Sequence, residues 1–324
     1  MGRLLVVLVG LCAVAGCGRG PAGWTADLTW GSQVRAAAEG QTGPLAVAAS
    51  SAAVVVADSF GHGLWVWSYQ GGAWTGPRRR AVPTSSPLVA VTLTGSTAET
   101  ADAAGTVWSV PAKGQAQILG RFPSEPGELR SVLALGSLGS SLVAEILDVR
   151  AQGSSRELVA LGPGERRVLQ RVLLASPAGQ APAGASWLLA PAGVRAGMAG
   201  GPGGALWLVG RRRNGRPALV RLDSAGSVAA FRAWPSLPSP SDLVGLDPSG
   251  LAWAVFSGGR REQTLVALDA AGRVRRSLPL PPGPGPLVPQ PVALAPDGSA
   301  VLLTSGTEAL TVHWFPPGVI WQRA

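Results

Sequence analysis

The chain has 324 residues, of which 46% are hydrophobic and 14% charged, and its formal net charge is +9. This apolar content excludes an intrinsically disordered chain, which combines low hydrophobicity with high charge. The 45 glycines and 28 prolines leave no stretch of ten residues beyond the first twenty with uninterrupted helical periodicity, so the sequence predicts an all-β fold of short strands and tight turns.

The positive charge has two interpretations. A basic protein often binds nucleic acid or an anionic membrane surface. However, Lys113 is the only lysine and Asn214 the only asparagine, whereas Ala, Gly, Pro and Arg are abundant. This skew is typical of a GC-rich coding sequence, so part of the basicity would then have no functional meaning.

The N-terminal segment has the layout of an export signal. Arg3 provides a positive charge, and an apolar run from Leu4 to Ala15 follows it. This run is too short to span a bilayer, where roughly 20 residues are needed, but it suits the hydrophobic region of a signal peptide. It ends in Val14-Ala15-Gly16-Cys17, which resembles the lipobox of bacterial lipoproteins.

The lipobox resemblance implies that residues 1–16 are a signal peptide that is removed, and that the Cys17 thiolate receives diacylglycerol. The mature chain would keep one cysteine, because Cys12 lies in the removed segment, and no disulfide could form. We therefore expect a lipid-anchored protein on the extracytoplasmic side of a cell membrane. The alternative is an ordinary secretory signal followed by an unrelated cysteine.

Residues 17–43 are expected to form the lipidated tether. The segment contains Trp24 and Trp30, and Asp27-Leu28-Thr29-Trp30 has the length and composition of a short strand. We predict that this strand adds an edge to the last unit of the fold and helps to close it.

Residues 44–324 contain an internal repeat of four short strands. The second strand of each unit is expected near residues 52, 97, 141, 205, 251 and 300, at intervals of 45, 44, 64, 46 and 49. The long interval contains a Pro/Gly/Ala-rich insertion at about 177–193. The units are expected at about 44–83, 87–123, 127–176, 194–235, 241–282 and 289–324, and Val319–Trp321 is the expected closing strand of the last one.

Four strands in about 45 residues are typical of a β-propeller blade, so the sequence predicts a six-bladed β-propeller of four-stranded antiparallel blades. A blade cannot bury both of its faces alone, but blades packed face to face around an axis can. A β-solenoid or two β-sandwiches are the alternatives, and they explain the period less well. The segments Gly201–Trp207 and Leu222–Val228 resemble blades of the streptogramin-lyase and NHL-type propeller families.

The resemblance does not extend to catalysis. Streptogramin lyases are expected to use histidines at the top of the propeller beside a magnesium site, but His62 lies in a Gly-His-Gly turn and His313 in the third strand of the last blade. Lactonase propellers bind calcium through inner-strand acids and asparagines, and Asn214 is the only asparagine. No nucleophile elbow, phosphate loop or metal-binding cluster is present, so we expect no cofactor and no metal.

Four aspartates recur at matched turns, and we expect them to be turn-forming residues rather than metal ligands. Asp223 and Asp269 precede the last strands of two blades, and Asp247 and Asp297 follow the first strands of two blades.

Arginines gather in the loops that join the second and third strands, which emerge on one face of a propeller. The expected set spans three consecutive blades: Arg150, Arg156, Arg211, Arg212, Arg213, Arg216, Arg260 and Arg261. Such a face would bind carboxylate or phosphate groups through bidentate pairing. The alternative is that these are solvated hairpin tips enriched by coding bias.

These patterns favour a non-catalytic scaffold, expected to be monomeric, that binds a protein or an anionic cell-envelope polymer on its arginine-rich face. Nucleic acid is not expected, because no aromatic residues alternate with the arginines. The alternative is an enzyme or small-ligand binder that uses the central channel. The inner strands Leu45–Val47, Leu243–Leu246 and Val292–Leu294 are small and apolar, which argues against it.

Overall fold

The computed structural model describes a large part of the chain, in fourteen stretches. These are residues 23–29, 46–58, 62–151, 153–162, 165–173, 187–189, 198–201, 204–212, 216–223, 225–235, 241–257, 262–281, 291–305 and 309–323. The predicted signal peptide and its cysteines, Cys12 and Cys17, lie outside the described residues. Among the residues described, no helix is long and apolar enough to cross a membrane.

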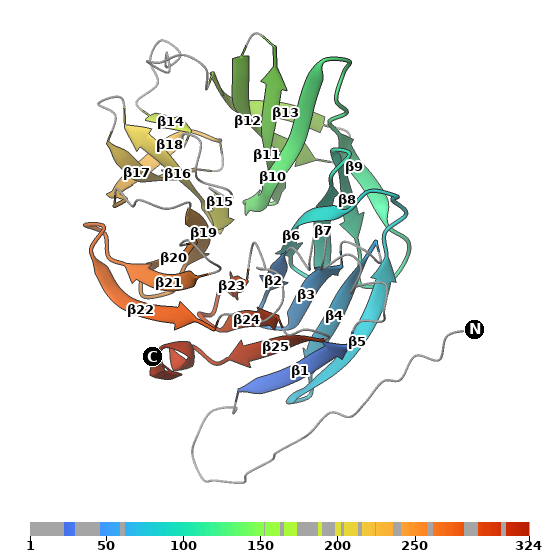
Figure 1. Ribbon diagram of the computed structural model, residues 1–324, viewed down its shortest axis with the longest axis vertical. Helices are drawn as coiled ribbons and strands as arrows, with labels where there is room; N and C mark the ends of the chain where they lie inside the picture. Colours follow the sequence, from blue (N-terminus) through green and yellow to red (C-terminus); the bar gives the residue numbers. More distant parts are fainter. Residues whose placement is uncertain are drawn as a thin grey trace.

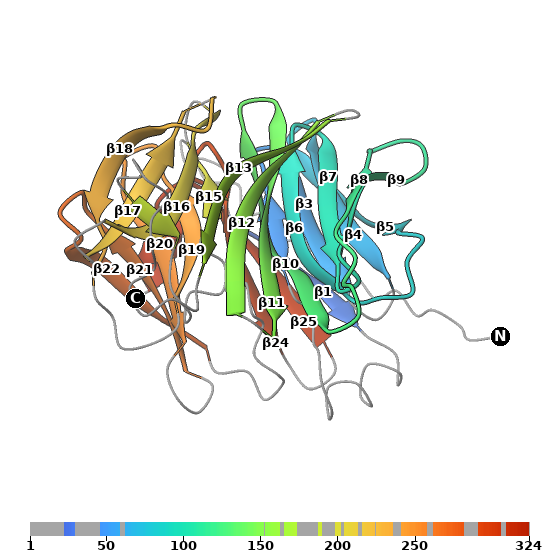
Figure 2. The ribbon, with the colours of Figure 1, turned by 90° about the horizontal axis from the view of Figure 1, so that it is seen from above.

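The strands form six antiparallel sheets, which are arranged as a ring of blades in Figure 1 and seen edge-on in Figure 2. Blade 1 comprises β2 (Val47–Ala49), β3 (Ala53–Asp58), β4 (Gly63–Gln70) and β5 (Ala73–Ala81). Blade 2 comprises β6 (Leu88–Thr94), β7 (Thr97–Asp102), β8 (Thr106–Val110) and β9 (Gln117–Arg121). Blade 3 comprises β10 (Glu128–Leu138), β11 (Ser141–Arg150), β12 (Gly153–Gly162) and β13 (Glu165–Leu173).

The second half of the ring has the same plan with one addition. Blade 4 comprises β15 (Met198–Gly200), β16 (Leu206–Arg212), β17 (Pro217–Leu222) and β18 (Val228–Ala233), and β14 (Trp187–Leu189) also pairs with β16. Blade 5 comprises β19 (Ser241–Leu246), β20 (Ala252–Ser257), β21 (Gln263–Leu268) and β22 (Val274–Leu280). Blade 6 comprises β23 (Val292–Leu294), β24 (Ala300–Ser305), β25 (Ala309–Phe315) and β1 (Trp24–Thr29).

The predicted six-bladed propeller is confirmed. The second strands β3, β7, β11, β16, β20 and β24 begin at residues 53, 97, 141, 206, 252 and 300, each within one residue of its expected start. Strand β14 was not expected, because it lies in the Pro/Gly/Ala-rich insertion and is only 3 residues long.

The last blade differs from the sequence prediction in its closing strand. Val319–Arg323 forms a short 3-10 helix, η2, instead of a strand. The chain turns at Pro316-Pro317-Gly318, since proline cannot continue a strand ladder and Gly318 has a positive φ of 75°. The fourth position is occupied by β1, which pairs antiparallel with β25 from Trp24↔Trp314 to Thr29↔Ala309.

The edge strand expected in the N-terminal segment therefore lies next to β25, and it starts three residues earlier than Asp27. Its pairing joins the N-terminal segment to the last blade and closes the ring between blades 6 and 1.

Tryptophans pack across this closure. The ring of Trp24 stacks on Trp74 of blade 1 with centroids 5.2 Å apart, and it meets Trp67 edge-on at 5.8 Å. Trp314 of β25 contacts Trp74 at 5.6 Å. Aromatic pairs of this geometry add stability beyond their buried area, so β1 contributes packing as well as hydrogen bonds.

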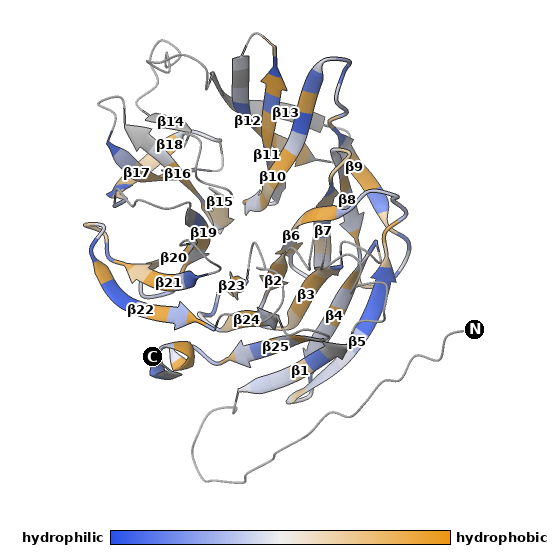
Figure 3. Cartoon of the chain, viewed as in Figure 1, coloured by the Kyte–Doolittle hydropathy of each residue, from blue (hydrophilic) through white to orange (hydrophobic). Residues whose placement is uncertain are grey.

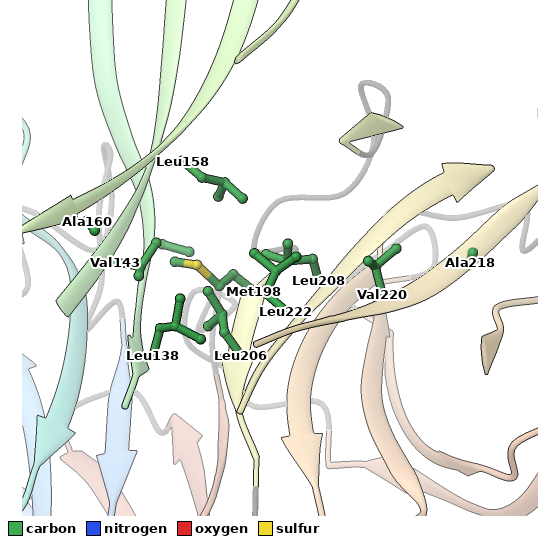
Figure 4. Packing of buried hydrophobic residues seen from close by; sticks show 11 residues of the cluster. Leu138, Val143, Leu158, Ala160, Met198, Leu206, Leu208, Ala218, Val220 and Leu222 are labelled. Atoms are coloured by element: carbon green, nitrogen blue, oxygen red, sulfur yellow. The ribbon is translucent and has the colours of Figure 1, made fainter. Parts of the chain in front are cut away.

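The core lies between the blades. Apolar stretches concentrate on the inner parts of the strands, whereas hydrophilic stretches lie on the outer strands β5 and β22 (Figure 3). Figure 4 shows one interface, in which Leu138 and Val143 of blade 3 face Met198 and Leu206 of blade 4. A Cβ on Gly136 would lie 2.9 Å from Leu206 Cδ1, so a larger residue there would displace the Leu206 side chain from this interface.

Candidate functional site

The central channel is narrow and lined mainly by small apolar side chains. A cavity of about 170 Å³ lies where the inner strands of the blades meet, and its lining includes Val47, Leu135, Ala199, Leu243 and Ala293. Sites for drug-sized ligands are usually ~300–1,000 Å³, so this cavity is small for a substrate. The apolar lining agrees with the inner-strand sequences.

Polar side chains in this lining are sparse. Thr92 and Ser137 contribute hydroxyl groups, and Asp242 contributes a carboxyl group with a relative exposure of 5%. Two hydroxyl groups and one carboxyl group, with no histidine, lysine, arginine or cysteine among the lining residues described, make a weak catalytic arrangement.

Neither histidine lines the channel. His62 adopts a positive φ of 49°, and its Nδ1 lies 3.1 Å from the Ser86 carbonyl in the connection between blades 1 and 2. His313 Nε2 lies 3.0 Å from Thr304 Oγ1 on the neighbouring strand. Both rings are thus engaged in structural contacts away from the axis, so the histidine pair expected of a streptogramin lyase is not assembled.

The four recurrent aspartates form turns, as predicted. Asp223 Oδ1 accepts hydrogen bonds from the backbone N–H groups of Ala225 and Ser227, both at 2.9 Å. Asp269 Oδ1 does the same for two turn residues of blade 5. These are Asx-type turns, in which the carboxylate replaces a backbone acceptor.

The equivalent pair after the first strands also stabilises turns. Asp247 Oδ1 accepts from the Leu251 N–H at 3.0 Å, and its Oδ2 accepts from Trp253 Nε1 at 3.0 Å. Asp297 Oδ1 accepts from the Ser299 N–H at 2.9 Å. Within the described stretches, no group of three or more His, Cys, Asp or Glu side chains could hold a metal ion.

Arg150 of the predicted arginine-rich face belongs to a charge network. Its Nη2 lies 2.7 Å from Glu128 Oε1 and 2.9 Å from Asp148 Oδ2, and Arg130 Nη2 lies 3.0 Å from the same Asp148 oxygen. The hydrogen bond from Arg150 lowers the pKa of Asp148 to about 2. Two arginines and two carboxylates compensate one another here, so Arg150 offers little free charge to a partner.

Arg156 is a correction to the sequence prediction. It lies within β12, not in a loop, and its relative exposure is 5%. Its Nη1 forms an ion pair with Glu145 Oε1 at 2.9 Å. The hairpin between β11 and β12 is shorter than expected, because pairing continues to Arg150↔Gly153, and this moves Arg156 into the sheet.

The structure describes the other predicted arginines only in part. Arg211 and Arg212 occupy the end of β16, with backbone partners Pro217 and Trp187, and their side chains are outside the described set. Arg216 is exposed next to β17. The predictions for Arg213, Arg260 and Arg261 lie outside the described residues.

Arginines on outer strands, which the sequence prediction did not include, connect neighbouring blades. Arg80 of β5 donates to the Pro111 carbonyl of blade 2 at 3.0 Å. Arg232 of β18 lies over the Trp207 ring at 4.8 Å and donates to the Gly250 carbonyl of blade 5. The sequence could have predicted this role, because both arginines lie on the fourth strand of a blade. Part of the arginine content is therefore structural.

One buried carboxyl group is poorly compensated. Glu99 of β7 has a relative exposure of 6%, and its Oε2 makes no hydrogen bond with the described part of the protein. Burial raises the pKa of Glu99 from 4.5 to about 7.

This pKa predicts a pH-dependent stability. Between pH 4.5 and 7 the folded protein keeps a proton that the unfolded chain has lost, so stability falls as pH rises through this range. The loss would approach about 3 kcal/mol at pH 8. We expect Glu99→Gln to remove this decline, which urea unfolding at pH 5, 6, 7 and 8 would measure. An unchanged decline in the variant would contradict the assignment.

Comparisons with known proteins give the fold. No protein-family model matches the chain, and no curated protein matches it. A gluconolactonase from Xanthomonas campestris is similar in structure, with 14% identity and a TM-score of 0.52 over 84% of this chain and 86% of that one. A chain of a mitotic checkpoint complex is similar at 12% identity and a TM-score of 0.51, over 96% and 98%.

A third similar structure is the WD40 β-propeller domain of Doa1, with 12% identity and a TM-score of 0.45 over 86% of this chain and 94% of that one. At these identities the similarity shows the β-propeller fold alone, and the function has to be argued from the residues.

Proposed function

We propose that the protein is a non-catalytic binding module, anchored through a lipid on Cys17 to the extracytoplasmic side of a membrane. The observation that supports it best is the contrast between the channel and the outer surface. The channel is small and lined mainly by apolar side chains, whereas exposed guanidinium groups lie on the outer strands and loops. A propeller of this kind is equipped to bind a partner on its outside.

The short distance along the chain between Cys17 and the fold supports the anchor. Strand β1 starts at Trp24, seven residues after Cys17 (24 − 17 = 7). An extended chain spans at most ~3.3–3.6 Å per residue, so the propeller would lie within about 25 Å of the lipid. Blade 6, which contains β1, would be the blade nearest to the membrane.

The partner we propose is an anionic cell-envelope polymer. The net charge of +9 would attract it from a distance. Arg216 is exposed, and Arg211, Arg212, Arg213, Arg260 and Arg261 belong to the same pair of blades in sequence. Arg150 and Arg156 are excluded from this surface because carboxylates pair with them.

The anchor is tested by membrane fractionation. We expect the wild-type protein to sediment with membranes and to resist extraction by 1 M salt, at which the Debye length is about 3 Å. Cys17→Ala should block lipidation and leave an unprocessed precursor, visible as a larger species on a gel. Cys12→Ala is the matched control and should behave as the wild type. A Cys17→Ala protein of mature mass and unchanged sedimentation would refute the anchor.

The partner is tested by affinity at different salt concentrations. Replacing Arg211–Arg213 and Arg260–Arg261 with glutamine should weaken binding to a wall or capsule polyanion and flatten its salt dependence. Binding with the same affinity and the same salt dependence would contradict the arginine-rich surface.

A further inference from the structure

A second polar site lies on the rim of the ring, at the junction of blade 5 with the C-terminal turn. An open depression of about 570 Å³ is lined by Arg276 and Ser277 of β22 and by Pro317, Gly318, Trp321 and Gln322 around η2. Its residues come from two segments about 40 positions apart in sequence, which the fold brings together.

The indole of Trp321 is fixed in orientation. Its ring lies edge-to-face against Trp253 with centroids 4.7 Å apart and an interplanar angle of 68°. Trp253 has a relative exposure of 1%, and its Nε1 donates to Asp247. Trp321 itself is only half-buried, so a rigid support presents part of an aromatic surface to solvent.

Arg276 places a positive charge beside this surface. Its guanidinium carbon lies 6.0 Å from the centre of the Trp321 ring, within the range of a cation–π interaction. The neighbouring Arg273 and Arg275 both pair with Asp269, at 3.0 and 2.8 Å. No carboxylate of the described residues pairs with Arg276, so its charge differs from theirs in being available to a ligand.

The remaining groups extend the polar contacts around the indole. Ser277 offers a hydroxyl group and Gln322 an amide, and both residues are exposed. An aromatic face attracts the polarised C–H groups on one side of a sugar ring, while hydroxyl and amide groups bond to its hydroxyls. The guanidinium can pair with a carboxylate through two parallel hydrogen bonds.

We propose that this rim depression binds an acidic saccharide, with the sugar ring on Trp321 and the carboxylate on Arg276. The proposal rests on the proposed function, since it names the chemistry of the anionic polymer and adds a site to the arginine-rich loops. It predicts a preference for a uronic acid over the neutral sugar of the same configuration.

The test uses the full chain in detergent, with oligogalacturonate as the probe and the matching neutral galactose oligomer as its control. We expect the acidic oligomer to bind at least ten-fold more tightly than the neutral one, because a hydrogen bond between charged groups is at stake. The indole N–H resonance of Trp321, assigned by its absence in Trp321→Phe, should shift on titration. A resonance that stays unmoved at saturation would place the sugar elsewhere and overturn the proposal.

Arg276→Gln should weaken the binding of the acidic oligomer about ten-fold or more and leave the affinity for the neutral oligomer unchanged. Arg275→Gln is the matched control, because it removes one neighbouring arginine from the same strand, and it should change the affinity less than two-fold. An equal loss of affinity for the acidic oligomer in the two variants would indicate general charge attraction and would overturn the proposal of a rim site. Thermal unfolding of each variant shows whether the fold is retained.

The outcomes separate this site from the proposed function. The loop variant is the protein in which Arg211–Arg213 and Arg260–Arg261 are replaced with glutamine. If the loop variant no longer binds the acidic oligomer and Arg276→Gln still does, the rim site is wrong while a polyanion-binding module stands. If neither the wild type nor any variant binds the oligomer at about 10 mM, the rim site is wrong. The binding of other polyanions and the membrane fractionation of Cys17→Ala then decide the proposed function independently.

Discussion

Removal of strand β1 should open the ring and lower the melting temperature more than any single surface substitution. Deleting residues 24–29 removes the whole antiparallel register with β25 and uncovers Trp74 and Trp314. A single Trp24→Ala change removes one large ring from this packing, and we expect it to cost about 3 kcal/mol. In a protein of this size that corresponds to a fall in melting temperature of roughly 4–6 °C.

The control for this prediction is Asp27→Ala. Asp27 is exposed in the same strand and accepts one hydrogen bond from Thr311 Oγ1 at 2.7 Å, so its loss should cost less than about 1 kcal/mol. Differential scanning calorimetry measures all three proteins. If the deletion melts at the wild-type temperature, β1 does not close the ring.

Loss of the buried ion pair in blade 3 is the second large effect we expect. Replacing Arg156 with methionine removes the ion-pair partner of Glu145, a carboxylate with a relative exposure of 2%. Breaking such a pair costs ~3–5 kcal/mol, mostly through the desolvated charge that remains. Denaturant unfolding at pH 7 should show this loss.

The double variant Glu145→Leu/Arg156→Met distinguishes a buried pair from an important single residue. Two apolar side chains in place of two charges should recover most of the lost stability. Arg150→Met is the control for a neighbouring arginine with a half-exposed side chain, and it should lower the stability much less than Arg156→Met does. A double variant as unstable as Arg156→Met would show that the pair is not the cause.

The sequence predicted the blades well because the turns that separate their strands are local. The Asp-x-x-Gly elements around Asp223, Asp269 and Asp247 form hydrogen bonds within five residues, so their positions can be read along the chain. The second strands consequently start where they were expected. Closure by β1 was expected as well, because the N-terminal segment had strand composition and the ring needed an edge partner.

Long-range pairing limited the prediction of the site residues. Arg156 was placed in a loop because arginines are usually exposed, and only its register opposite Leu147, which brings it within reach of Glu145 on the same strand as Leu147, explains its burial. The sequence did contain a signal for this burial, because Arg156 alternates with Leu158 and Ala160 and therefore lies on the same face of the strand. The rim depression was missed because Val319–Trp321 was expected to be a strand, and η2 instead turns Trp321 toward Arg276.

We propose that binding occurs on the outside of the ring and not in its channel, and one comparison tests this most directly. The affinity for a polyanionic envelope polymer is measured at several salt concentrations for the wild type, for the loop variant, for Arg276→Gln and for Ser137→Phe, which fills the channel cavity. We predict that both arginine variants weaken binding about ten-fold or more, whereas Ser137→Phe binds as the wild type does. Loss of binding in Ser137→Phe with unchanged affinity in the arginine variants would contradict binding on the outside of the ring and place the ligand in the channel.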